Sequence, residues 1–174
     1  PAVHLTSRDI AECLSRHFGT EVEPVPEKLT ELIKQDISDY INKANIGITG
    51  ANAIAAEEGV VVLVHNEGNI VEVIMRPGKH IIVAGINKVY PNLEEAINMT
   101  KLQTFYATGS LTTSFITILS GPSQTADIEK KLISGIHGPK EVCLILLDNY
   151  RSQIANSEFK ELLFCIGCGT CLLV

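Results

Sequence analysis

The sequence contains no tryptophan, and its aromatic side chains are limited to five Phe and four Tyr. Proteins that bind single-stranded nucleic acids stack bases on aromatic rings, so such platforms are poorly supplied here. Positive charge is also in deficit, with 14 Lys and Arg against 20 Asp and Glu and a formal net charge of −6. Binding to a nucleic-acid duplex depends on clustered positive charge, so we expect no nucleic-acid partner.

Long hydrophobic runs are also lacking. The strongly apolar stretches Gly59–Val64 and Val142–Leu147 are far shorter than the roughly 18 residues that a membrane span requires. No basic stretch followed by an apolar one opens the chain, so we expect no retained secretory signal. The 174 residues are 45% hydrophobic and 20% charged, which is typical of a folded domain of ordinary size.

The five cysteines are unevenly distributed. Cys13 and Cys143 stand alone in apolar surroundings, and we expect both to be buried and unreactive. Cys165, Cys168 and Cys171 crowd together near the end of the chain. An odd and clustered set differs from the even framework of a secreted disulfide scaffold. It favours reduced thiols in a cytoplasmic protein, three of them arranged for a metal.

The three clustered cysteines have the C-x2-C-x2-C spacing that opens the bacterial 4Fe–4S motif. In that motif the fourth cysteine follows after three more residues, and here Leu172–Val174 fill those places before the chain ends. We therefore expect Cys165, Cys168 and Cys171 to be metal ligands, with a 4Fe–4S cluster in the full-length protein and an absent or incomplete one in this 174-residue chain. Half of a zinc ribbon, a redox dithiol and a chance cluster are the alternatives.

Helical periodicity is strongest in the first quarter of the chain. The apolar spacing over Thr6–Phe18 predicts an amphipathic helix, with Thr6 and Asp9 as a capping pair and Gly19 as its stop. A second helix is expected over about 27–44, and a later one from Asn92, its N-cap, to about residue 104.

Strand signals dominate the middle of the chain. The β-branched run Gly59–Val64 predicts a strand buried on both faces, and the alternation over Ile70–Met75 predicts its hairpin partner. The remaining predicted elements are a short helix over 53–57, strands over 81–84, 115–119 and 142–147, and helices over 125–133 and 157–164. The strand–helix–strand order over 115–147 favours a parallel crossover. Together these elements predict a three-layer α/β domain with a mostly parallel sheet and an antiparallel hairpin.

Three glycine-bearing loops are the candidate ligand pocket. In open parallel sheets the loops beyond the carboxyl ends of the strands form the ligand crevice. The loops around 50–52, 65–69 and 121–127 would then bring together polar side chains that can orient a small anionic substrate. The candidates are Asn52, Glu67, Ser123, Thr125 and Asp127. Alternatively, each serves only its own turn or helix cap. A further hypothesis makes Glu67 a carboxylate nucleophile toward an activated acyl group.

Several longer stretches resemble the LUD-domain family. They include ITGANAIAAEEGVVVLVHNEGN, HIIVAGINKVYPNLEEA, SGPSQTADIE, GPKEVCLILLDNYRS and CIGCGTC, in this order, and the resemblance runs from about His4 to Cys171. The family has an additional N-terminal region, and its members continue beyond the third cysteine. Tyr150 stands where many members have Gly. The resemblance therefore implies a core of the family domain over residues 1–164 and a truncated ferredoxin-type motif over residues 165–174.

The resemblance also implies a fold and a function. The fold would be the α/β/α arrangement of ribose-5-phosphate isomerases and CoA transferases. The function would be that of a cytoplasmic iron–sulfur electron-transfer component in the oxidation of L-lactate or a similar 2-hydroxy acid, with other subunits of a lactate oxidation complex as partners. Two alternatives remain open: a CoA-transferase-like or ligase-like enzyme acting on a small carboxylate or phosphate, and a binding or assembly module without chemistry of its own.

Overall fold

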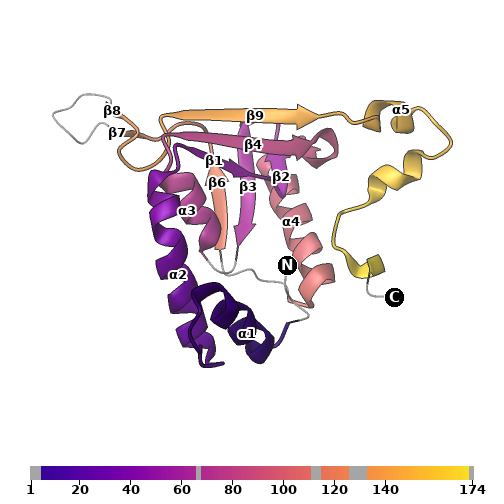
Figure 1. Ribbon diagram of the computed structural model, residues 1–174. Coiled ribbons are helices and arrows are strands. Elements are labelled where there is room, and N and C mark those ends of the chain that lie inside the picture. Colours follow the sequence, from indigo (N-terminus) through magenta and orange to yellow (C-terminus); the bar gives the residue numbers. More distant parts are fainter. Residues whose placement is uncertain (1–4, 66–67, 111–114, 126–132, 173–174) are drawn as a thin grey trace. The chain divides into compact units, whose positions relative to one another are not determined.

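The computed structural model describes residues 5–65, 68–110, 115–125 and 133–172. The chain divides into two compact units, residues 1–43 and residues 44–174. The first unit is helical, and the second is a mixed α/β unit that carries the cysteines of the clustered set (Figure 1).

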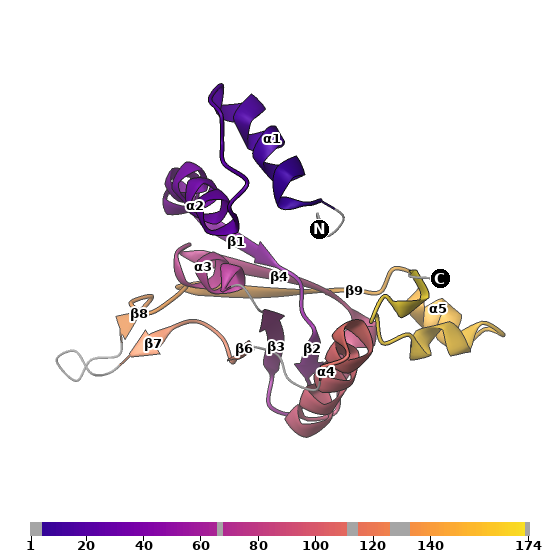
Figure 2. The same ribbon diagram turned by 90° about the horizontal axis from the view of Figure 1, so that it is seen from below.

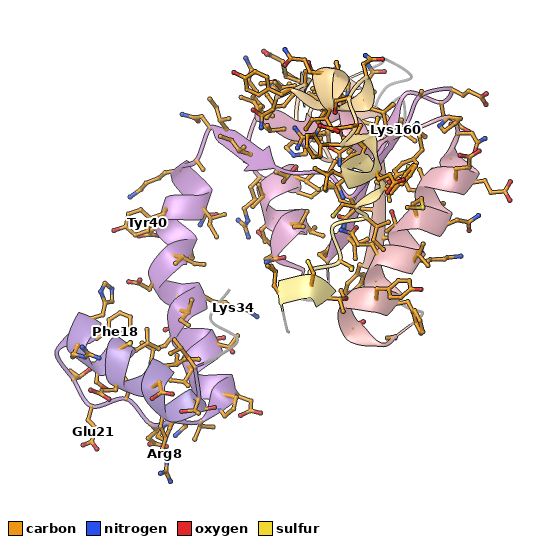
Figure 3. The ribbon with its side chains drawn as sticks, turned by 90° about the vertical axis from the view of Figure 1, so that its right-hand side faces the viewer. Arg8, Phe18, Glu21, Lys34, Tyr40 and Lys160 are labelled. Carbon is orange, nitrogen blue, oxygen red and sulfur yellow. The ribbon has the colours of Figure 1, made fainter. Side chains whose placement is uncertain are left out.

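The first unit consists of helices α1 (Ser7–Phe18) and α2 (Pro26–Lys43). The predicted cap of α1 is confirmed, because the Asp9 amide donates to Thr6 Oγ1 and the Asp9 carboxylate accepts from the Thr6 amide. Gly19 ends the helix in the left-handed conformation, as predicted. The two helices share a small apolar core around Ala11, Val22 and Leu29. Tyr40, 76% exposed, projects away from α2 (Figure 3).

A four-stranded mixed sheet lies in the second unit, in the order β5 (Val89–Tyr90), β2 (Ala53–Ala55), β3 (Val60–His65), β6 (Phe115–Leu119). The prediction that the β3 run is buried on both faces is confirmed. Val60 and Val62 pack with helix α4 (Leu93–Thr108), whereas Val61 and Leu63 face a second cluster of apolar side chains. A strand with two buried faces requires an unbroken apolar run instead of an alternating one.

A three-stranded parallel sheet completes the core, in the order β1 (Ile46–Thr49), β4 (Lys79–Gly85), β9 (Glu141–Leu147). Its strands run crosswise to those of the mixed sheet (Figure 1). Ile82 and Ala84 of β4 join Val61 and Leu63 of β3 in one apolar cluster, so the main core lies between the two sheets. Helix α3 (Asn69–Met75) packs so closely on β1 that a side chain at Gly47 would collide with the Val73 carbonyl. The absence of a side chain at Gly47 permits this close approach.

The predicted hairpin has the wrong second strand. Residues 70–75 form helix α3 instead of a strand, because Ile70 and Ile74, four residues apart, pack on one side against the main core. The strand beside β3 is β2, which pairs with it in antiparallel fashion over residues 53–55. A short helix was expected there. The small side chains of Ala53 and Ala55 are instead fully buried beneath α4, so tertiary packing overrides the helix preference of alanine.

The predicted parallel crossover over 115–147 is also wrong. Strand β6 pairs with β3 in the mixed sheet, and β9 pairs with β4 in the parallel sheet. Where the 125–133 helix was expected, Gln124–Thr125 (β7) and Ile133–Ser134 (β8) form a short antiparallel pair, and residues 126–132 lie outside the described residues. In place of the single mostly parallel sheet of the prediction, the described strands form a parallel sheet, a mixed sheet and the two-stranded β7–β8 pair.

The segment after β9 begins its helix earlier than predicted. Helix α5 covers Arg151–Ala155, and the expected 157–164 helix is reduced to a 3-10 turn over Lys160–Phe164 (η2), in which Lys160 lies (Figure 3). Turning the view shows this segment running on from the end of β9 toward α4 (Figure 2). Within the described ranges no helix is long and apolar enough to cross a membrane.

Candidate functional site

The cysteine segment, residues 165–171, ends in the 3-10 turn Thr170–Leu172 (η3). Cys165 and Cys171 are exposed and Cys168 is half-buried. Gly167 and Gly169 between them adopt the left-handed conformation, which lets the backbone turn twice in a few residues. In the part of the chain that the structure describes, no three His, Cys, Asp or Glu side chains converge to hold a metal. The thiol chemistry suits an iron–sulfur centre, but this arrangement of the thiols does not fit one.

Three polar contacts attach the cysteine segment to the α/β core. Lys88 Nζ donates to the Ile166 carbonyl at 3.5 Å, and Gln103 Nε2 donates to the Gly167 carbonyl at 3.2 Å. The Thr170 hydroxyl donates to the Tyr106 carbonyl at 2.8 Å. Lys88 belongs to the 3-10 turn Ile86–Lys88 (η1), and the other two partners lie on α4. The segment is thus held by two side chains and one backbone carbonyl that lie 64 to 78 residues earlier in the chain.

Gln103 also joins the cysteine segment to the mixed sheet. Asn52 Nδ2 donates to Gln103 Oε1 at 3.2 Å, while Asn52 Oδ1 accepts from the Val64 amide of β3 at 2.9 Å. Val64, Asn52, Gln103 and Gly167 therefore form a continuous chain of hydrogen bonds, here called the amide chain. Asn52 was predicted as a pocket residue, and the structure gives it this bridging position.

Two groups in or beside the cysteine segment, Lys88 and Cys168, have pKa values below their ordinary ones. Burial lowers the pKa of the Lys88 ammonium, and the neighbouring Cys165 partly opposes that shift. The hydrogen bond with the Thr170 side chain, at 3.2 Å, lowers the pKa of the Cys168 thiol. Neither Lys88 nor Gln103 had a local signal in the sequence, because their importance arises only when the segment folds back on them.

The prediction that Cys13 and Cys143 are buried is wrong, since both are exposed. Cys13 lies beside the packed face of α1, where Ile10, Leu14 and Phe18 contact the core. Cys143 lies on β9, which has a hydrogen-bonded neighbour on one side alone in the parallel sheet. Cys13 also has a cationic neighbour, because Arg16 Nη2 approaches its Sγ at 3.9 Å.

Two of the other predicted pocket residues, Ser123 and Thr125, have partners in the neighbouring backbone. The Ser123 amide donates to the Pro139 carbonyl at 2.9 Å, and Ser123 Oγ accepts from the His137 amide at 3.2 Å. Thr125 pairs with Ile133 in the β7–β8 pair. Glu67 and Asp127 lie outside the described residues. The convergence of the three loops on one pocket therefore remains a prediction.

A hollow that sequence reasoning missed opens where β4 and β9 end. The two strands are parallel and in register up to the pair Gly85 and Leu147, so their carboxyl ends lie side by side. Asn87 of η1 and Arg151 of α5 line a hollow of about 450 Å³ just beyond them. It is here called the β4–β9 crevice. Ligands commonly bind beyond the carboxyl ends of parallel strands, and the residues that line this crevice lie outside the three predicted loops.

The fold and the site define a mixed α/β domain with a cysteine-rich extension docked on its last long helix. Residues 1–147 match the LUD domain family. The chain belongs to the LUD-domain family, which confirms the resemblance found in the sequence.

Two relatives illustrate the relationship. The chain is 36% identical over 172 residues to a protein named uncharacterized electron transport protein YkgF from Escherichia coli (strain K12), with 99% of this chain and 34% of the relative covered. It is 35% identical over 174 residues to lactate utilization protein B from Geobacillus sp. (strain WCH70), with 100% of this chain and 35% of the relative covered. The chain thus spans about a third of the length of these relatives.

Among solved structures, the crystal structure of a DUF162 family protein from Deinococcus radiodurans aligns with a TM-score of 0.39 and 17% identity. The alignment covers 61% of this chain and 55% of that one.

Proposed function

We propose that this chain is part of an iron–sulfur electron-transfer component in the oxidation of L-lactate or a similar 2-hydroxy acid. The observation that carries the proposal is the C-x2-C-x2-C segment, which is docked on a LUD-family domain through the amide chain and Lys88. The names of the two relatives, one an electron transport protein and the other a lactate utilization protein, support the same function.

Cys165, Cys168 and Cys171 would supply three thiolate ligands of a 4Fe–4S cluster in the full-length protein. The described arrangement does not bring the three thiols to one centre, so binding would require the segment to rearrange. Gly167 and Gly169 give its backbone the freedom to do so. The segment has no buried residue, so such a rearrangement leaves the hydrophobic core intact.

We further propose a cytoplasmic location, partner subunits that complete a lactate oxidation complex, and the three-layer fold of the ribose-5-phosphate isomerases and CoA transferases. The parallel sheet, the mixed sheet and the covering helix α4 are consistent with that fold. Partner subunits are consistent with apolar side chains that stay exposed on β9, among them Leu146 and Leu147.

The test is anaerobic purification of the full-length protein, with iron and sulfide analysis and visible spectroscopy before and after addition of L-lactate and its partner subunits. We expect stoichiometric iron and sulfide, and bleaching of the iron–sulfur absorbance by L-lactate. Cys168→Ser should lower the iron content, whereas Cys13→Ser and Cys143→Ser should leave it unchanged. Full iron content in Cys168→Ser would contradict the ligand assignment. Exchange labelling of Glu67 by a CoA thioester would instead favour the CoA-transferase alternative.

A further inference from the structure

The β4–β9 crevice contains one charged side chain among those that line it, Arg151. Its guanidinium is fixed at two points: Nε donates to Asn87 Oδ1 at 2.7 Å, and Nη1 donates to the Asp148 carbonyl at 3.1 Å. Across the described residues Nη2 has no hydrogen-bond partner, and no carboxylate forms a salt bridge with Arg151. A positioned guanidinium with free donor capacity is suited to binding a carboxylate or phosphate.

The carboxylate of Asp148, whose carbonyl accepts from Arg151, is engaged by Ser152. Asp148 Oδ1 accepts from the Ser152 amide at 2.8 Å and from the Ser152 hydroxyl at 2.7 Å. These bonds, the backbone one first, lower the pKa of Asp148. The Asp148 carboxylate is therefore held by Ser152 at the start of α5. The charge of Arg151 also lowers the pKa of Asp148, but the two side chains form no salt bridge, so the guanidinium keeps hydrogen-bond donors for a ligand.

The backbone around the crevice is shaped to place Arg151 there. A side chain at Gly85 would collide with Asn87 Oδ1 and would approach the Arg151 guanidinium carbon to 3.1 Å. Asn149 and Tyr150 both adopt positive φ angles, 43° and 65°, in the turn that leads from β9 to Arg151. Consecutive left-handed residues other than glycine are strained, and such strain concentrates at functional sites.

The remaining lining suits an organic anion better than an inorganic one. Ile86, Ala155 and Leu163 supply apolar lining, and Asn156 supplies a further polar group. Ligand sites typically combine an apolar lining with a few fixed polar groups, in volumes of about 300–1,000 Å³. We infer that the β4–β9 crevice binds a small organic carboxylate, with its carboxylate on Arg151 and its carbon chain against Ile86 and Leu163. This inference deepens the proposed function by locating a site for the acid, but it does not depend on the cysteines or on iron.

Thermal unfolding and calorimetric titration of the 174-residue chain test the inference, with L-lactate, pyruvate and inorganic phosphate as probes. We expect L-lactate or pyruvate to bind and to raise the unfolding temperature, because a ligand that binds the folded state alone stabilises it. Arg151→Gln should weaken binding at least tenfold. Gly85→Ala, which keeps every charge but displaces Asn87 and Arg151, should also weaken it. Arg8→Gln, which removes one positive charge from exposed α1, should bind as tightly as the unsubstituted chain.

Each other outcome is decisive. Carboxylate binding that is unchanged in a folded Arg151→Gln variant would overturn the inference, and so would tighter binding of phosphate than of both carboxylates. Absence of binding by all three probes to the folded, unsubstituted chain would overturn it as well. Because none of these measurements involves iron, carboxylate binding can succeed where cluster assembly fails, and the two proposals are separately testable.

Discussion

The centre of the α/β unit and the segment that follows β9 are built on opposite principles. Leu63 and Ile82 between the two sheets, and Val62 beneath α4, are almost completely removed from solvent. From Asp148 to Leu172 no residue is buried, and the cysteine segment is attached by three side-chain hydrogen bonds. The cysteine segment therefore contributes little to folding stability, and its position can change without unfolding the core.

The largest expected difference between the two regions is in the cost of removing a leucine side chain. Leu63 is 2% exposed in the main core, so Leu63→Ala should lower the free energy of unfolding by about 2–5 kcal/mol. Leu162, 65% exposed in η2, is the matched control. Leu162→Ala should change the free energy of unfolding by less than about 0.5 kcal/mol. Urea denaturation of both variants measures the difference. Similar losses in the two variants would show that the segment is part of the folded core.

The second difference is in pH dependence. His80 is completely buried in β4, with Nε2 2.8 Å from Thr49 Oγ1, and burial lowers its pKa. A lowered pKa means that the unfolded chain takes up the proton first. The contribution of neutral His80 to the free energy of unfolding is therefore fully present above the unfolded-state pKa of about 6.5. It is lost as the pH decreases below that value, by at most about 1.4 kcal/mol per pH unit.

Chemical denaturation between about pH 5 and pH 7.5 tests this prediction. The curve of unfolding free energy against pH should flatten in His80→Gln, whatever the overall loss of stability, and should keep its slope in His137→Gln, a change at an exposed histidine. An unchanged slope in His80→Gln would exclude His80 as the source.

The third prediction concerns the attachment of the cysteine segment. Gln103→Glu keeps an acceptor for Asn52 but loses the donor to the Gly167 carbonyl. We expect a loss of about 1 kcal/mol of unfolding free energy and faster alkylation of Cys165, Cys168 and Cys171. Gln153→Glu on α5 introduces the same charge as a control. Mass spectrometry measures the alkylation rate of the three cysteines in both variants. Equal rates in Gln103→Glu and Gln153→Glu would contradict the proposed role of Gln103 in attaching the segment.

The smallest effect is expected at the join between the two regions. Tyr150 is 68% exposed and has a φ of 65°, a conformation that costs most residues roughly 1–2 kcal/mol and glycine almost nothing. Tyr150→Gly should therefore stabilise the protein by up to about 1 kcal/mol, since the flexibility of glycine in the unfolded chain offsets part of the gain. A decrease in the unfolding temperature of Tyr150→Gly would show that the tyrosine ring contributes packing.

The sequence predicted elements well where local signals decide the structure. The caps of α1 and of α4, the doubly buried β3 and the strand over 142–147 all follow from spacing and residue type. The prediction failed at α3 because the spacing of Ile70 and Ile74 fits either a helix or a strand. It failed at β2 because Ala53 and Ala55 are small in order to pack beneath α4, a contact that the local sequence does not reveal. Local sequence patterns do not predict which helix packs on which strand.

The candidate sites divide in the same way. The cysteine segment was visible from its spacing, which requires no tertiary information. Lys88, Gln103 and Arg151 were not, because each acquires its partner from a distant part of the chain. The β4–β9 crevice could be located only once β9 was known to lie beside β4 instead of beside β6.

The amide chain also has a direction. The Val64 amide must donate to Asn52, and the Gly167 carbonyl must accept from Gln103, so both side-chain amides are held with their NH2 groups toward the cysteine segment. Their dipoles add head to tail, and each hydrogen bond polarises the next. The electropositive end of this aligned pair faces residues 165–171. In the described arrangement, these two oriented amides would stabilise a negative charge placed on residues 165–171.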